Sequence, residues 1–260
     1  MKAFTTIAGS LALFITAMGL CIGLVIVNAS LSPELVWFPL PLIAVLVAVT
    51  VWSEQRFGIG LRNARQTSAR STGRSTAMAA GIAVAGVAAC VLQGALSDLT
   101  LSAEAGPANT SALFQFSYAV LLSVAPAVLA EVAFRGLMQS RLEALWGTWP
   151  AILVITTFNT ASHRWGDDLA AQWLGYFAAL AGLGWLRSVT GSLWPPLLTH
   201  VLANLVTALA LWRFGPFVQG AIGGAGLIAL AAVMAGGVLM AHRAARSSAD
   251  RAGTDGQRLG

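Results

Sequence analysis

The sequence predicts an all-α protein, namely a polytopic membrane helix bundle with about eight transmembrane helices. Of its 260 residues, 57% are hydrophobic and only 10% are charged, and the mean hydropathy is +0.76. Soluble domains carry about 25% charged residues, and a domain of this length buries only about three quarters of the surface that its unfolded chain exposes. The excess apolar surface must therefore face lipid, which excludes a soluble globule, a disordered chain and a nucleic-acid-binding module.

Eight apolar runs are the candidates for the spanning helices. A span needs about 20 apolar residues, and only helices and closed barrels satisfy the backbone inside hydrocarbon. The runs lack the strict alternation of barrel strands, so we expect helices. In chain order the runs cover residues 5–29, 35–53, 76–97, 112–134, 149–163, 169–187, 193–213 and 217–241.

Arginine gathers in two polar segments and predicts the orientation of the bundle. Five arginines lie between the second and third runs, and four lie in the C-terminal tail. Cytoplasmic segments carry an excess of Lys and Arg, so both segments should be cytoplasmic. We therefore expect a multi-pass protein of the cell membrane with both termini in the cytoplasm. Cys21 and Cys90 lie in apolar runs and read as small hydrophobic residues.

A few ionisable and amide side chains interrupt the apolar runs, where each costs about 2.5–3.5 kcal/mol if charged. Glu131 and Arg135 are four residues apart, so they share a helix face and can pair. His200 and Asn204 have the same spacing and point the same way into the bundle, where hydrogen bonds between helices are an alternative role. His163 lies among charged neighbours, where a solvated histidine is the ordinary case.

The spacing around Gly147 predicts that two of these residues meet. Glu131 lies 16 residues before Gly147, and His163 lies 16 residues after it. If the chain turns near Gly147, the two helices are antiparallel and residues equidistant from the turn face each other. At 1.5 Å per residue, both are about 24 Å from the turn.

A carboxylate, two imidazoles and an amide in one dehydrated cavity predict hydrolysis of an acyl bond. The carboxylate or an imidazole can take a proton from water, while neutral donors can stabilise an oxyanion. Ser162 has no nucleophile elbow around it and neither cysteine lies near a histidine in the sequence, so water is the expected nucleophile. We expect no cofactor. A zinc ion is the alternative, although no His-Glu-x-x-His helix is present.

Three segments resemble the motifs of the CPBP family, the membrane-embedded CAAX prenyl endopeptidases and bacteriocin-processing or self-immunity proteins that are also called the Abi family. The segments are AEVAFRG (130–136), FNTASH (158–163) and GSLWPPLLTHVLAN (191–204), and the resemblance covers roughly residues 112–206. The family pattern is a Glu-Glu pair with Arg four residues after its second Glu, then Phe-x-x-x-His, then His-x-x-x-Asn.

The resemblance implies catalytic roles for Glu131, His163, His200 and Asn204, with Arg135 in support and no metal. In the family, the first Glu of the pair and the histidine of the second motif activate water, and the last His and Asn form the oxyanion site. Glu131 corresponds to the second Glu. Two positions depart from the pattern, since Ala130 replaces the first Glu and Asn159 stands where the family has Phe.

These departures leave three hypotheses. The first is an intramembrane endopeptidase of the CPBP type that cleaves a membrane-associated peptide or a lipidated protein. The second is a CPBP-fold protein that has lost catalysis and acts on a partner membrane protein in immunity or regulation. The third is a small transporter that relays protons through Glu131 and the histidines.

The same reasoning divides the chain into four parts. We expect three helices with a basic cytoplasmic loop in 1–111, a CPBP-like core in 112–213, a last helix in 214–241 and a disordered basic tail in 242–260 that is attracted to anionic lipid. Membrane lipid and a peptide substrate are the expected partners.

Overall fold

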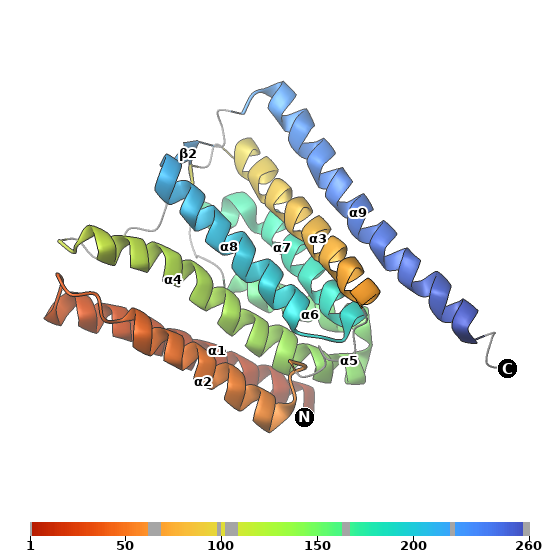
Figure 1. The fold of residues 1–260 in the computed structure, drawn as a ribbon, viewed down its shortest axis with the longest axis horizontal. Helices are drawn as coiled ribbons and strands as arrows, with labels where there is room; N and C mark the ends of the chain where they lie inside the picture. Colours follow the sequence, from red (N-terminus) through yellow and green to blue (C-terminus); the bar gives the residue numbers. More distant parts are fainter. Residues whose placement is uncertain are drawn as a thin grey trace.

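The computed structural model describes residues 2–61, 69–97, 100–101, 109–162, 167–218 and 222–256. In these ranges the chain is almost entirely helical, which confirms the all-α prediction (Figure 1). The elements are α1 (Lys2–Leu31), α2 (Pro39–Phe57), α3 (Ala69–Leu96), β1 (Thr100–Leu101), α4 (Ala112–Ala130), η2 (Glu131–Gln139), α5 (Ser140–Trp146), α6 (Thr148–Ala161), α7 (Asp167–Thr190), α8 (Trp194–Phe214), β2 (Phe217–Val218) and α9 (Gly224–Gly256). β1 and β2 form a two-residue antiparallel pair.

Six helices of the described chain are long and apolar enough to cross a membrane. They are Lys2–Leu31, Pro39–Phe57, Gly73–Leu96, Ala112–Trp146, Trp194–Phe214 and Gly224–Ala245, and they correspond to six of the eight predicted runs. The other two runs are helical as well. Run 149–163 corresponds to α6, whose 14 residues are fewer than the about 20 that a span needs, and run 169–187 corresponds to α7.

The fourth predicted run continues far beyond its predicted end. α4, η2 and α5 form one helical stretch of 35 residues, Ala112–Trp146. The stretch ends at Gly147, whose φ of +81° suits glycine, and α6 begins directly after it. The predicted turn near Gly147 is therefore confirmed.

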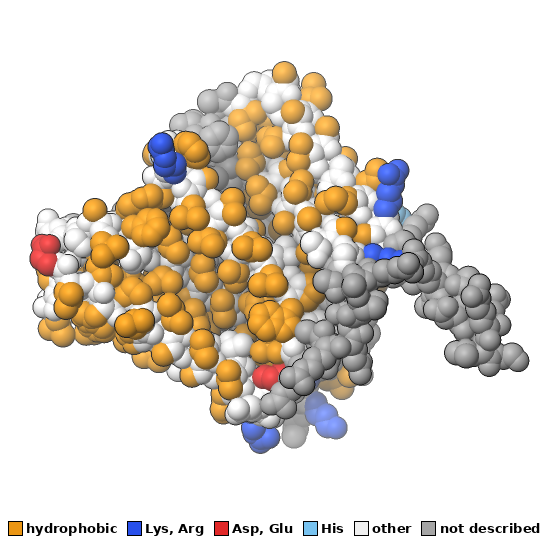
Figure 2. All heavy atoms as spheres, in the orientation of Figure 1, with side chains coloured by type: hydrophobic (Ala, Val, Ile, Leu, Met, Phe, Trp, Pro, Cys, Tyr) orange, Lys and Arg blue, Asp and Glu red, His pale blue; other side chains and the backbone are white. Residues whose placement is uncertain are grey.

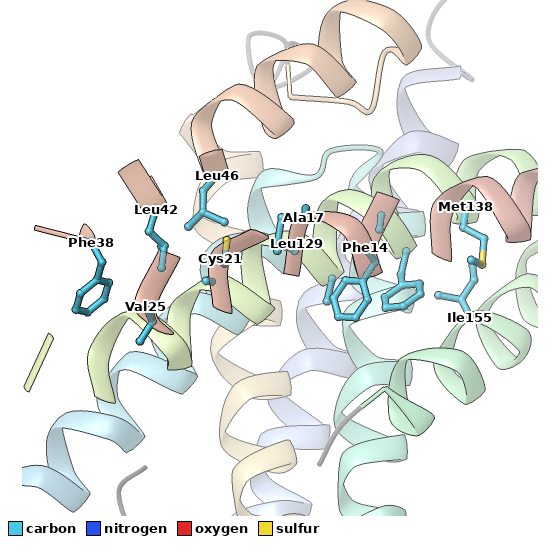
Figure 3. Packing of buried hydrophobic residues seen from close by; sticks show 14 of the residues in the cluster. Phe14, Ala17, Cys21, Val25, Phe38, Leu42, Leu46, Leu129, Met138 and Ile155 are labelled. Atoms are coloured by element: carbon cyan, nitrogen blue, oxygen red, sulfur yellow. The ribbon is translucent and has the colours of Figure 1, made fainter. Parts of the chain in front are cut away.

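An apolar cluster joins the N-terminal helices to the fourth one (Figure 3). Side chains of α1 and α2 pack there against α4, η2 and α6, and the phenyl rings of Phe14 and Phe134 lie 5.2 Å apart. Asn28, which is fully buried in α1, binds the following turn by accepting from the Trp37 and Phe38 amides at 2.9 Å each. The cluster fixes the face of η2 that points away from α7.

Glycine allows the helices on the other side of the bundle to approach closely. A Cβ on Gly81 of α3 would lie 2.5 Å from the Gly237 carbonyl oxygen of α9, and one on Gly175 of α7 would lie 2.7 Å from the Cα of Cys90. Such contacts between small residues are typical of helix packing in lipid. α9 therefore lies directly against α3, at the outer edge of the bundle (Figure 1).

The surface is that of a membrane protein. The face in Figure 2 is mostly hydrophobic, and its charged side chains lie at the margins. Large apolar side chains are exposed along the spans, for example Leu40 at 78%, Ile228 at 74% and Val206 at 63%. Water would penalise such a surface, whereas lipid does not.

The C-terminal segment differs from its prediction. We expected a disordered tail from residue 242, but α9 continues as helix to Gly256. The segment contains several alanines and arginines, which are good helix formers, and it continues from a helix that is already formed. The polar composition of this segment is therefore compatible with a helix, because extending an existing helix requires no new nucleation.

Candidate active site

Glu131 lies where the fourth helix changes its winding. α4 has α-helical geometry up to Ala130, and the nine residues Glu131–Gln139 form a π-helix before α5 resumes the α-helical form. π-helical turns are rare and are frequent at functional sites. Every residue of η2 is buried, including the side chains of Glu131, Arg135 and Gln139 at 0% exposure. Three polar groups that cost free energy to bury are therefore held in the centre of the bundle.

His200 contacts Glu131 directly. The imidazole Nδ1 lies 2.8 Å from Glu131 Oε1, and both side chains are buried. α8 begins at Trp194, so His200 lies in its second turn. Two prolines occupy the first turn, where the missing backbone N–H costs no hydrogen bond. The spacing around Gly147 predicted that Glu131 meets His163, and the structure shows Glu131 in contact with His200.

Arg135 neutralises Glu131 and binds through both terminal guanidinium nitrogens, while its buried Nε has no partner among the described residues. Its Nη1 lies 3.2 Å from Glu131 Oε1, the same oxygen that faces His200. Nη2 donates to the Leu180 carbonyl oxygen of α7 at 2.9 Å. With its amide turned so that the oxygen faces the guanidinium, Asn159 of α6 accepts from Nη1 and, at 3.2 Å, from Nη2. The guanidinium thus joins three helices, which is the arrangement that makes a buried charge tolerable.

A ladder of polar contacts fixes the rotation of η2 and α5 against α7. Arg135 contacts Leu180, Gln139 Nε2 donates to the Gly184 carbonyl oxygen at 2.7 Å, and Ser188 Oγ donates to Glu143. The two partners in each contact are 45 residues apart, so the segments run parallel and in register. This ladder holds the helix that carries Glu131 at one depth.

Asn204 does not touch Glu131 but shares a cavity with His200. The Asn204 amide Nδ2 donates to the Ser123 carbonyl oxygen of α4 at 2.9 Å, and its second hydrogen has no acceptor among the described residues. His200 and Asn204, one helical turn apart, line a cavity of about 220 Å³ between α3, α7 and α8. The cavity is large enough to admit water molecules.

The hydrogen-bond pattern assigns the protons at the centre of the site. Because Glu131 Oε1 accepts from the Arg135 guanidinium, the carboxylate is the charged form, and His200 Nδ1 must then be the donor of the 2.8 Å contact. His200 Nε2 is left as the ring atom available to a molecule in the cavity. Glu131 Oε2 is buried and has no partner among the described residues. The acceptor that the site presents to the cavity is therefore on His200, which lines it, while Glu131 orients the imidazole.

One predicted site residue, His163, and the zinc alternative stand apart from the contacts above. His163 lies outside the described residues, so its predicted meeting with Glu131 stays a prediction. The described residues contain no group of three or more His, Cys, Asp or Glu that could hold a metal ion. The Arg135 guanidinium beside Glu131 Oε1 also opposes a cation there, so the described donors do not fit zinc.

Sequence reasoning missed Asn159 as a part of the site. It is fully buried in α6 and binds Arg135, yet its sequence signal was only a departure from the Phe-x-x-x-His pattern. The other departure, Ala130, lies in the apolar cluster with Phe14 and Phe134 and is 3% exposed. A carboxylate at position 130 would therefore enter apolar surroundings here.

Comparison with known families agrees with these motifs. Residues 112–206, which run from α4 into α8 and include the whole polar cluster, match the family model of the type II CAAX prenyl endopeptidases, Rce1-like. This segment is similar to the Rce1-like domain of that family. Searches of curated proteins and of solved structures find no match to the chain. The resemblance noted in the sequence is thereby confirmed, and it supports an intramembrane protease in general terms.

The Rce1-like segment supplies most of the site but not all of its walls. Glu131, Arg135, Asn159, His200 and Asn204 all lie within residues 112–206. One wall of the cavity comes from α3, which precedes the segment. The part of the chain outside the family match therefore helps to shape the cavity beside His200.

Proposed function

We propose that this protein is an intramembrane endopeptidase in which the Glu131–His200 pair activates water in the cavity between α3, α7 and α8. The observation that carries the proposal is the 2.8 Å contact between His200 Nδ1 and Glu131 Oε1, at the edge of a cavity that His200 also lines. A carboxylate that accepts from one imidazole nitrogen fixes the tautomer and makes the other nitrogen a better base, as an Asp does for the His of a serine protease.

The proposed reaction has two stages, and one proton is transferred in each. The water oxygen attacks the scissile carbonyl carbon while its proton passes to the Glu131–His200 pair. The carbonyl oxygen becomes an oxyanion, to which Asn204 donates its remaining amide hydrogen. Collapse of this intermediate breaks the carbon–nitrogen bond, and the pair returns the proton to the leaving amine. His163 is proposed as a further catalytic residue on the basis of the motif alone.

The proposed substrate is an extended peptide segment of a membrane-associated protein, with a hydrophobic or lipidated C-terminal region. The cavity is too small for a folded domain, and most of its lining is apolar, with Ile82, Val87 and Leu183 among its residues. Only an unfolded segment can bring its backbone to His200 there. The location in the membrane favours substrates that are already bound to lipid.

One observation favours a second candidate, a CPBP-fold protein without peptidase activity. Ala130 occupies the position of the first motif glutamate and packs in the apolar cluster with Phe14. In this case the buried Glu131–Arg135–His200 cluster would fix the helices against one another, and the protein would act by binding a partner in the membrane. Buried polar groups of this kind can specify one packing arrangement.

A cleavage assay in proteoliposomes separates the two candidates. The full chain is reconstituted with a single-span reporter that has a hydrophobic C-terminal segment, and products are identified by mass spectrometry. We expect Glu131→Gln to lower the rate by at least a hundredfold, since the loss of the comparable carboxylate in serine proteases costs about 10⁴-fold. Glu34→Gln, at an exposed carboxylate between α1 and α2, should cleave like the unmodified protein.

Folding has to be separated from chemistry, because Glu131→Gln leaves Arg135 buried without its anionic partner. Breaking a buried pair costs about 3–5 kcal/mol. The double variant Glu131→Gln, Arg135→Met removes that charge, and it should insert and elute as a single species while remaining inactive. The peptidase proposal would be refuted if the double variant cleaved at the rate of the unmodified protein. It would also be refuted if the unmodified protein cleaved no peptide in a library of membrane-anchored segments.

A further inference from the structure

A second hollow lies far from the polar cluster, between the first half of α3 and the second half of α9. It has a volume of about 930 Å³ and is open on one side. Arg74 of α3 and Arg243 of α9 both line it, and Leu239 and Met240 line it from α9. We call this hollow the α3–α9 groove. It has one strongly basic part and one apolar part.

The two guanidinium groups in the α3–α9 groove lack an anionic partner. Arg74 is half-buried and Arg243 is exposed, and neither is paired with an acidic side chain in the described part of the chain. Arg56 and Arg141, at the same end of the bundle, differ because both lie over the ring of Phe57. Two like charges that face one hollow repel each other, and an anion between them removes that repulsion.

The rest of the groove indicates what kind of anion fits. Leu239 and Met240 are 47% and 39% exposed, so an apolar surface continues from the arginines along α9. A Cβ at Gly73 or Gly236 would meet nothing within 4 Å, so no side chain fills the groove at these positions. A free phosphate would leave this apolar wall uncovered, whereas an acyl chain would cover it.

The position of the groove in the bundle agrees with a lipid ligand. The close contact of Gly81 with Gly237 joins α3 and α9 beside the groove. Arg74 lies in the second turn of α3, and Arg243 lies near the end of the apolar span Gly224–Ala245 of α9. The first turns of α3 lie at the side of the bundle where α5 lies (Figure 1). Basic pockets between helices at a membrane surface bind the phosphate headgroups of lipids.

We propose that the α3–α9 groove binds one anionic phospholipid, with its phosphate between Arg74 and Arg243 and an acyl chain along Leu239 and Met240. The bound lipid adds contacts between α9 and the rest of the bundle. This site does not depend on the peptidase proposal, because it shares no residue with the polar cluster or its cavity.

Retention of lipid on the purified full chain tests the proposal. The protein in neutral detergent is titrated with phosphatidylglycerol, phosphatidylcholine or inorganic phosphate, and bound species are counted by native mass spectrometry. We expect phosphatidylglycerol to bind at one saturable site. Arg74→Gln with Arg243→Gln should weaken the binding of phosphatidylglycerol about thirtyfold, because each arginine near a lipid surface raises the affinity about fivefold. The matched pair Arg56→Gln with Arg141→Gln should weaken it twofold or less.

A steric variant tests the same site without a change of charge. Gly236→Phe places a ring in the groove and should abolish the saturable site, while Gly9→Phe, at an equally open glycine of α1, should leave it unchanged. The proposal would be overturned if the two arginine pairs lost affinity equally, or if phosphatidylcholine were retained as well as phosphatidylglycerol. It would also be overturned if inorganic phosphate saturated the site at the concentrations used for the lipid, or if Gly236→Phe left binding unchanged.

Discussion

His200 Nδ1 lies 2.8 Å from Glu131 Oε1, although 69 residues separate the two along the chain. Arg135 contacts the same carboxylate oxygen at 3.2 Å, so one oxygen receives two donors from two different helices. The other oxygen, Oε2, has no partner in the described structure. The carboxylate is therefore held at one atom by His200 and Arg135, and through this contact it orients the imidazole that lines the cavity.

Asn204 should contribute to the rate more than to substrate binding. Loss of one oxyanion donor costs about 10²–10³-fold in kcat in proteases, and we expect Asn204→Ala to lower kcat by that amount with little change in KM. Single-turnover cleavage of the membrane reporter measures this. Thr207→Ala is the matched control, since Thr207 lines the same cavity one turn further along α8. A purely structural Asn204, bound only to the Ser123 carbonyl oxygen, would lower stability and leave kcat unchanged.

Ala130→Glu restores the family residue and should not raise activity. The new carboxylate would lie in the apolar cluster with Phe14, where an unpaired charge costs several kcal/mol. We expect a lower unfolding temperature in detergent and no gain in cleavage. Ala130→Gln, of equal size and without charge, separates crowding from the charge. A large gain in proteolysis by Ala130→Glu would instead indicate that the unmodified site is degenerate.

Asn159 should stabilise the site through Arg135. Asn159→Leu removes the amide oxygen that accepts from the guanidinium, and an unsatisfied buried donor costs about 1–3 kcal/mol. Thermal unfolding in detergent should show that loss, and cleavage should fall because Arg135 no longer holds Glu131 in place. Thr157→Val, at an exposed position of the same helix, should change neither quantity. An unchanged unfolding temperature for Asn159→Leu would contradict the contact with Arg135.

Two neighbouring glycines of α9 should respond in opposite ways to the same substitution. A Cβ on Gly237 would lie 2.6 Å from the Gly81 carbonyl oxygen, whereas a Cβ on Gly236 would meet nothing within 4 Å. Gly237→Ala should therefore destabilise the bundle by about 1–3 kcal/mol and expose α9 to limited proteolysis. Gly236→Ala should keep or raise stability by up to about 1 kcal/mol, since alanine favours helix. Equal effects would mean that α9 does not pack at Gly81.

Features that depend on near neighbours in the chain could be predicted from the sequence. The composition alone placed the protein in lipid, and the apolar runs predicted the helices because a span has a required length. Glu131 and Arg135 meet because residues four apart share a helix face. The turn at Gly147 followed from a residue that tolerates positive φ. Each of these is decided within a few residues.

Only the tertiary structure decided which helices touch and at which depth. The contacts of His200 with Glu131, and of Asn159 with Arg135, depend on the rotation of η2, α6 and α8 about their axes. That rotation is set by the close approach of small residues and by the polar ladder from Arg135 to Ser188, both of which join distant parts of the chain. The π-helix at Glu131 and the groove beside Arg74 arise in the same way. Helical periodicity carries no information on the relative rotation of two helices, so these features emerge only when the bundle packs.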